Sequence, residues 1–267
     1  LGPFVAAGPG PPGPAGAGAA SGHRLRSVIA MAQELITDRL LRSWLRCKRR
    51  AWLDRHGDPG ERQWTAHRAL ALSDQLRSFQ SLLPEKPGRG EAAAMAGAAG
   101  VVGLRLRSQT KRLQLEAHPP LLERVKGPSL WGDHAYRPVL GRQGRNLTRE
   151  HRLLLAYWGR LLEERQQAPV THALVVAGEG RGLERERLAL GGGLQRQLDE
   201  ALQKLAGELQ RSSPPPLVAD RKKCVLCSWR GVCDREAAAT GHLSEVSGIG
   251  GKRREMLLEL GIETLPQ

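Results

Sequence analysis

Residues 135–177 read AYRPVLGRQGRNLTREHRLLLAYWGRLLEERQQAPVTHALVVA. The run 135–140 carries β-branched and aromatic residues and is followed by a glycine, which is typical of a strand. Apolar residues then recur at helical spacing from Leu147 to Leu162, and 171–177 is again an apolar strand-like run. A strand, a helix and a second strand in succession predict an α/β fold.

The sequence on either side repeats these two signals. We expect strands at 101–107, 113–117, 121–125 and 183–190. We expect helices at 37–56, with Thr37 as N-cap, at 64–83, from about Glu91, and at 194–209. This order predicts an α/β core with one mixed sheet flanked by helices.

The composition favours a basic, folded protein. Of the 267 residues, 41 are Lys or Arg and 27 are Asp or Glu, which gives a net charge of +14. Such an excess points to a polyanionic partner, with nucleic acid as the first candidate. No stretch approaches the roughly 18 uninterrupted apolar residues of a membrane span, which excludes an integral membrane protein.

Three regions differ in composition. Residues 1–30 are rich in Gly and Pro and carry no charge before His23. Such a segment buries too little to offset its ordering entropy, so we expect a disordered extension there. Residues 31–240 are expected to form the main domain and 241–267 a C-terminal unit. No charged segment precedes an apolar run as in a signal peptide, and we expect a cytoplasmic protein.

The four cysteines form a candidate metal site. Cys224, Cys227 and Cys233 follow the spacing C-x2-C-x5-C, and Cys47 lies far upstream. Four cysteines are too few for a disulfide scaffold, whereas four thiolates are a complete ligand set for a metal centre. Zinc ribbons usually have two close pairs, so the three-plus-one arrangement fits a [4Fe–4S] cluster better, with zinc as the alternative. For Cys47, a buried core thiol is the competing interpretation.

Basic residues surround the cysteine trio. We expect their charges to offset the negative charge of a cluster and to lower the thiol pKa values. These residues are Arg221, Lys222, Lys223 and Arg230.

Residues 243–254, LSEVSGIGGKRR, are typical of a helix–hairpin–helix. Glycines allow close approach of the backbone to a ligand, and the start of a helix offers free N–H groups to a phosphate. A plain glycine-rich turn is the alternative. Residues 260–265 look like the start of a second hairpin, so we expect the unit 241–267 to be truncated. The expected DNA contacts are Gly248, Gly250, Gly251, Lys252 and Arg253.

Taken together, these features resemble the iron–sulfur branch of the RecB-type PD-(D/E)XK nuclease-like family. The resemblance rests on LRCKRRAWL at 45–53, the remote C-x2-C-x5-C and the helix–hairpin–helix, and covers roughly residues 37–265. It implies a restriction-endonuclease-like core, DNA as partner, and a cluster that joins the two ends of the nuclease fold.

The residues that the resemblance implies for catalysis are missing. Pro120 stands where the family has a metal-binding Asp, and Leu140-Gly141-Arg142 stands for its (D/E)-x-K. Leu154 takes the place of a Gln, and His67 is a candidate for an upstream His. Pro and Leu cannot bind Mg²⁺ and Arg cannot act as a base, so we expect that hydrolytic activity has been lost.

Two alternatives remain at this stage. One is an active metal-dependent DNA exonuclease with shifted carboxylates, for which Glu116, Glu123 and Asp133 are the weak candidates and Mg²⁺ the cofactor. Asp220-Arg221-Lys222 is the D-x-K of the chain, but we expect it outside the sheet. The other alternative is a structural zinc protein that binds nucleic acid.

Overall fold

A computed structural model describes residues 34–63, 85–110, 112–142, 146–179, 182–219, 221–246 and 249–264. Several expectations therefore fall outside the described residues. These are the extension 1–30, the helix 64–83 with His67, the residues Asp220 and Gly248, and the side chains of Lys222 and Lys223.

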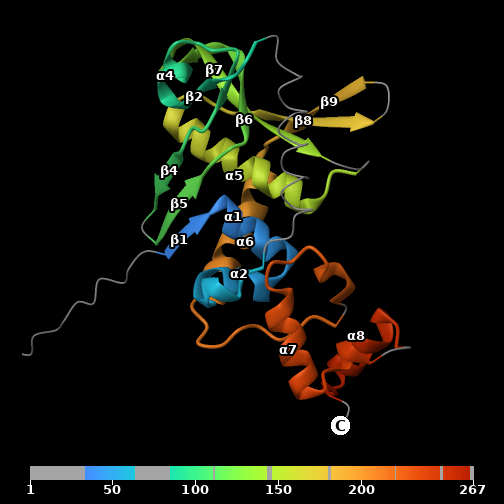
Figure 1. The fold of residues 1–267 in the computed structure, drawn as a ribbon. Helices are drawn as coiled ribbons and strands as arrows, with labels where there is room; N and C mark the ends of the chain where they lie inside the picture. Colours follow the sequence, from blue (N-terminus) through green and yellow to red (C-terminus); the bar gives the residue numbers. More distant parts are fainter. Residues whose placement is uncertain are drawn as a thin grey trace, which may run out of the picture. The chain divides into compact units, whose positions relative to one another are not determined.

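The larger sheet has six strands in the order β2-β3-β6-β7-β8-β9 (Figure 1). β6 and β7 form a long hairpin in which Leu121 lies opposite Val139. β7 runs parallel to β8, and the crossover between them is the helix α5, Arg149–Gln166. Parallel strands need such a crossover, so this β–α–β unit explains the alternation in the sequence. The strand bounds are β2 Gly88–Arg89, β3 Gly100–Val102, β6 Leu121–Ser129, β7 Gly132–Arg142, β8 His172–Glu179 and β9 Gly182–Ala189.

A second sheet has three strands in the order β1-β5-β4. The expectation of one mixed sheet is therefore wrong for the described residues, although the α/β class is confirmed. The single strand expected at 101–107 is divided between β3 and β4, which belong to different sheets. Gly103 adopts a φ of 67°, a left-handed conformation that turns the chain between them. The bounds are β1 Glu34–Thr37, β4 Leu106–Gln109 and β5 Leu113–Ala117.

The first expected helix is two helices, α1 (Asp38–Arg46) and α2 (Lys48–His56), separated at Cys47. Thr37 is the N-cap, as predicted, and accepts a hydrogen bond from the N–H of Leu40 at 3.1 Å. The later elements are α4 Gly90–Met95, α6 Gly192–Leu209, α7 Arg230–Thr240 and α8 Gly251–Glu259, with short 3-10 turns at Pro59–Glu61, Arg221–Cys224 and Leu243–Glu245.

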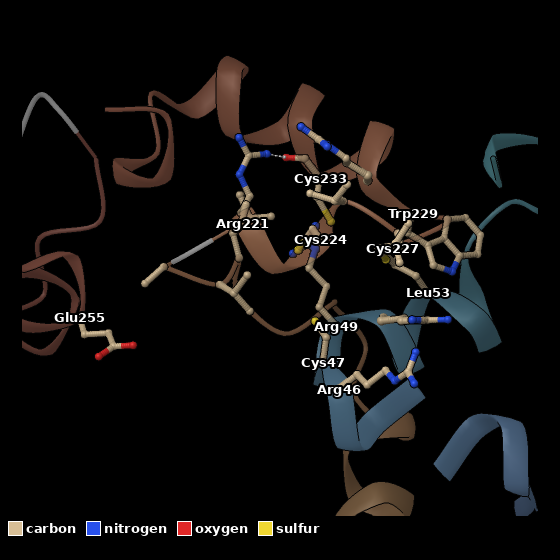
Figure 2. A pocket seen from close by; sticks show the side chains of 17 residues that line it. Arg46, Cys47, Arg49, Leu53, Arg221, Cys224, Cys227, Trp229, Cys233 and Glu255 are labelled. Atoms are coloured by element: carbon tan, nitrogen blue, oxygen red, sulfur yellow. Dashed lines mark hydrogen bonds between the residues drawn. The ribbon is translucent and has the colours of Figure 1, made fainter. Parts of the chain in front are cut away.

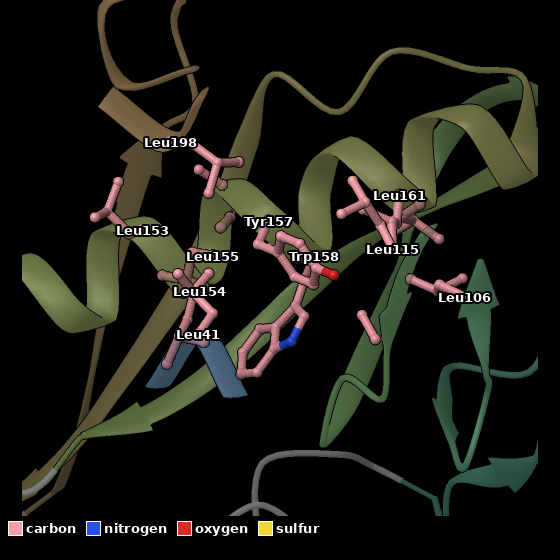
Figure 3. Packing of buried hydrophobic residues seen from close by; sticks show 14 of the residues in the cluster. Leu41, Leu106, Leu115, Leu153, Leu154, Leu155, Tyr157, Trp158, Leu161 and Leu198 are labelled. Atoms are coloured by element: carbon pink, nitrogen blue, oxygen red, sulfur yellow. The ribbon is translucent and has the colours of Figure 1, made fainter. Parts of the chain in front are cut away.

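Helix α5 is the centre of the hydrophobic core. It contacts strands of both sheets as well as α1 and α6, and its apolar residues point into the cluster drawn in Figure 3. The buried hydroxyl of Tyr157 donates a hydrogen bond to the carbonyl oxygen of Ile36 at 2.7 Å. It accepts one from the N–H of Glu116 at 3.1 Å. Tyr157 thereby fixes the parallel pair β1 and β5 against α5. None of the described helices is long and apolar enough to span a membrane.

Candidate metal centre

Cys47 occupies the break between α1 and α2. Its backbone is extended, with φ −163° and ψ 121°, and it ends one helix and begins the next. Its N–H donates to the carbonyl of Ser43 at 2.9 Å, and its carbonyl accepts from Ala51 at 3.2 Å. Cys47 thus closes α1 through its N–H and opens α2 through its carbonyl oxygen.

The other three cysteines lie on the segment 221–233. Cys224 ends a 3-10 turn, and its carbonyl accepts a hydrogen bond from the N–H of Cys227 at 2.9 Å. Cys233 lies in the first turn of α7, where its N–H donates to the carbonyl of Trp229 at 3.2 Å. Local backbone bonds therefore fold the C-x2-C-x5-C spacing into one compact loop and helix start.

All four cysteines line one cavity of about 800 Å³ (Figure 2). None forms a disulfide, and each is partly exposed. Every pair among the four is close enough for one thiol to influence the pKa of the other. The structure thus brings Cys47 together with a segment more than a hundred residues away in the chain.

The sulfurs of the four labelled cysteines stand apart from one another in Figure 2. Within the described part of the chain, no group of three or more His, Cys, Asp or Glu side chains is arranged to hold a single metal ion. A mononuclear zinc site needs its thiolates at about 2.3 Å from one centre. The described side chains do not meet this requirement.

A buried hydrogen-bond network holds the two cysteine-bearing segments together. Asp54 of α2 accepts hydrogen bonds from the indole N–H of Trp229 at 2.8 Å and from the hydroxyl of Ser43 at 2.5 Å. Arg62 pairs with the same carboxylate and lies over the ring of Trp229, 5.4 Å from its centroid. The N–H of Gln63 donates to Ser228 at 2.9 Å. Asp54 and Trp229 were not predictable as site residues, since nothing in their local spacing marks them.

The pKa values of Cys47, Cys224 and Cys233 are raised, contrary to expectation. Burial and the neighbouring cysteines raise the pKa of Cys224 to about 11, and the charge of Arg221 offsets this only in part. Burial also raises the pKa of Cys47 and Cys233. These pKa values rise because the cost of charging a desolvated thiol exceeds the attraction of the nearby cations.

The cations expected to face the cysteines are largely engaged elsewhere. Arg221 pairs with Asp234 at 2.6 Å and also with Glu245, and Arg230 pairs with Asp234 at 3.2 Å. Figure 2 shows Arg221 turned to the carbonyl of Cys233, to which it donates at 3.0 Å. Two arginines of α2, Arg49 and Arg50, also line the cavity. Arg49 donates to the carbonyl of Pro215 at 2.8 Å and pairs with Glu236, and its charge and a hydrogen bond also act on the Cys233 thiol.

The positions expected for catalysis lie at one end of the β6–β7 hairpin. Leu121 pairs with Val139 in this antiparallel hairpin. Position 120, one residue before Leu121, therefore lies next to Leu140, one residue after Val139. Leu140 is 1% exposed and Leu154 is 0% exposed, and both belong to the main hydrophobic cluster. Two positions that would need polar groups for hydrolysis are thus part of the apolar core.

The three candidate carboxylates are not assembled into one site. Glu116 lies in the three-stranded sheet and pairs with Arg105 at 2.5 Å and Arg107 at 3.1 Å. Glu123 lies in the other sheet, where it is opposite Arg137 and pairs with it at 2.7 Å. Asp133 is four residues from Arg137 along β7, which corresponds to about 13 Å.

The candidate hairpin has one regular helix. Gly250 is the N-cap of α8, and Gly251, Lys252 and Arg253 form its first turn, with Lys252 and Arg253 exposed. The preceding element is only the 3-10 turn Leu243–Glu245, so the first of the two expected helices is a single turn. Buried Arg254 donates from its guanidinium to the carbonyl of Val246, which ties the helix to the loop before it.

The sequence matches no protein-family model and no curated protein. A solved structure described as "Crystal structure of SSO0001" aligns with a TM-score of 0.43 and 10% sequence identity, over 76% of this chain and 86% of that chain. A likeness at this TM-score does not establish a shared fold.

Proposed function

We propose that this protein binds DNA through a nuclease-like core that has lost hydrolytic activity, and that a structural [4Fe–4S] cluster is held by Cys47, Cys224, Cys227 and Cys233. The observation that carries the proposal is that these four cysteines, from distant parts of the chain, line one cavity. When bound, the cluster would supply covalent links between the α1–α2 break and the segment 221–233.

The three-plus-one spacing of the cysteines in the chain favours a cluster over a single zinc ion. In a cluster of this type each thiolate binds a different iron, so the four sulfurs stand apart around a volume. The cavity of about 800 Å³ that the four cysteines line has room for such a cluster. A single zinc ion bound by the same cysteines is the alternative to the cluster.

The loss of hydrolysis is supported by the two buried leucines. A metal-dependent nuclease holds Mg²⁺ with carboxylates next to the attacking water. Leu140 and Leu154 instead extend the apolar core at the positions where the resemblance implies polar groups. Glu116 and Glu123 are each paired with two arginines and are engaged in ion pairs.

DNA binding is supported by charge and by the start of α8. The net charge of +14 favours a polyanion, and the exposed Lys252 and Arg253 lie beside the first free N–H groups of that helix. Contacts of this kind hold phosphates without reading base sequence. We therefore expect sequence-tolerant binding that weakens steeply with salt.

The deciding experiment is anaerobic purification, followed by visible spectroscopy and by iron, sulfide and zinc assays. We expect iron and acid-labile sulfide in equal amounts and a broad absorption that Cys47→Ser abolishes. Zinc without sulfide would reject the cluster. Labelled DNA incubated with the loaded protein and Mg²⁺ or Mn²⁺ should stay intact, and cleavage that Glu123→Ala abolishes would contradict the loss of hydrolysis.

A further inference from the structure

Arg50 is a buried cation without a counter-charge. It lies in the first turn of α2, three residues after Cys47, and is only 7% exposed. It lines the cysteine cavity. In the described part of the chain no hydrogen bond or ion pair engages its guanidinium, and its buried Nε has no partner.

The other arginines of the cavity differ in this respect. Arg46 donates twice to Glu150, at 2.7 and 2.8 Å, and Arg49 pairs with Glu236. Arg221 and Arg230 share Asp234. Among the described residues that line the cavity, Glu255 supplies the carboxylate. Figure 2 shows it on α8, away from the cysteines and from α2.

A guanidinium in this position is stabilised by an anion in the cavity. Arginine does not lose its proton in proteins, so it cannot escape the cost of burial by becoming neutral. Two further cations, Arg42 and Arg62, are close enough for the charge of Arg50 to lower their pKa values, which adds repulsion. A negatively charged group in the cavity that Arg50 lines would lower this cost.

We propose that Arg50 is the counter-charge of the metal–thiolate centre and raises the reduction potential of its cluster. The inference rests on the proposed [4Fe–4S] centre. Iron, sulfide and four thiolates together carry net negative charge, and one-electron reduction adds one more negative charge. A fixed cation beside the cluster stabilises the reduced form more than the oxidised form, because the attraction grows with the charge.

The test compares three variants of the full chain, loaded with the cluster. Arg50→Gln removes the charge, Arg50→Lys keeps it, and Arg46→Gln removes a cavity cation that Glu150 already neutralises. The measurements are the midpoint potential from an anaerobic dithionite titration followed by visible absorption, the iron content and the thermal unfolding curve. We expect a shift to more negative potential in Arg50→Gln, a potential near wild type in Arg50→Lys, and no comparable shift in Arg46→Gln.

The outcomes separate this inference from the proposed function. Wild-type protein without iron and sulfide would overturn the proposed function, and the role of Arg50 with it. If the loaded wild type and loaded Arg50→Gln have equal midpoint potentials, the role of Arg50 is overturned. The proposed function is then unaffected. If Arg50→Gln does not retain iron, retention in Arg50→Lys supports the charge role. Loss of iron from both variants would contradict it, because the shape of the side chain would then decide.

Discussion

Trp229 donates its indole N–H to the carboxylate of Asp54 at 2.8 Å, and its side chain is 1% exposed. Asp54 lies on α2, two turns after Cys47, whereas Trp229 lies between Cys227 and Cys233. This bond therefore joins the two segments that carry the cysteines. It is made between two side chains of the protein, which hold these two segments beside each other.

Trp229→Phe should loosen this connection. It removes one buried donor from a charged acceptor, and we expect the free energy of unfolding to fall by about 1–3 kcal/mol. Trp52→Phe is the matched control, because it removes an exposed indole bond to the carbonyl of Arg211 at 2.9 Å and should cost about 1 kcal/mol or less. Urea denaturation followed by circular dichroism measures both. A loss in Trp229→Phe no larger than in the control would argue against the role of Asp54.

Gly57→Ala should disturb the same contact from the other side. A Cβ at position 57 would lie 2.7 Å from the carbonyl oxygen of Leu53 and 2.8 Å from the ring of Trp229. Such overpacking typically costs about 1–3 kcal/mol. Gly207→Ala, in the last turn of α6 with nothing within 4 Å of its Cβ, should instead stabilise by about 1 kcal/mol or less. Thermal unfolding of the two variants should shift in opposite directions.

Glu116 should make the protein sensitive to acid. Burial opposes ionisation, but hydrogen bonds and charge from Arg105 and Arg107 outweigh it and hold the pKa of Glu116 below its ordinary value of 4.5. A carboxyl group whose pKa is lowered in the folded state stabilises the folded protein at pH values above its unfolded-state pKa. That stabilisation is lost as the pH falls through the folded-state value.

Between neutral pH and pH 4.5 the wild type should exceed Glu116→Gln in stability, and the difference should shrink below pH 4.5. Glu164→Gln, at an exposed position on α5, serves as control. Chemical denaturation at a series of pH values measures the effect. A difference that stays constant down to pH 2 would show that the ion pairs of Glu116 contribute nothing.

Lys252→Ala and Arg253→Ala should weaken DNA binding to the same degree on unrelated sequences. Each variant should also reduce the slope of log affinity against log salt by about one, as expected for one lost phosphate contact. Lys126→Ala, at an exposed position on β6, should leave the slope unchanged. Fluorescence anisotropy over a range of salt concentrations gives the slopes. Slopes equal to that of the wild type in both Lys252→Ala and Arg253→Ala would remove α8 from the proposed DNA surface.

Most elements were predictable because their signals are local. The N-cap Thr37, the strand Leu113–Ala117 and the helix after Thr148 follow from spacing within a few residues, and the structure confirms them. The separation of β3 from β4 was not predictable in this way. It depends on a positive φ at Gly103 and on pairing with strands elsewhere in the chain.

The sequence by itself determined the α/β class, the caps and the spacing of Cys224, Cys227 and Cys233, since these depend on residues that are neighbours in the chain. Only the tertiary structure decided that Cys47 lines the same cavity, that Leu140 lies in the core, and that Arg50 alone among its neighbouring arginines has no counter-charge in the described chain. These properties depend on which distant groups meet after folding. Burial and ion pairing are fixed by such long-range contacts, and residue spacing carries no record of them.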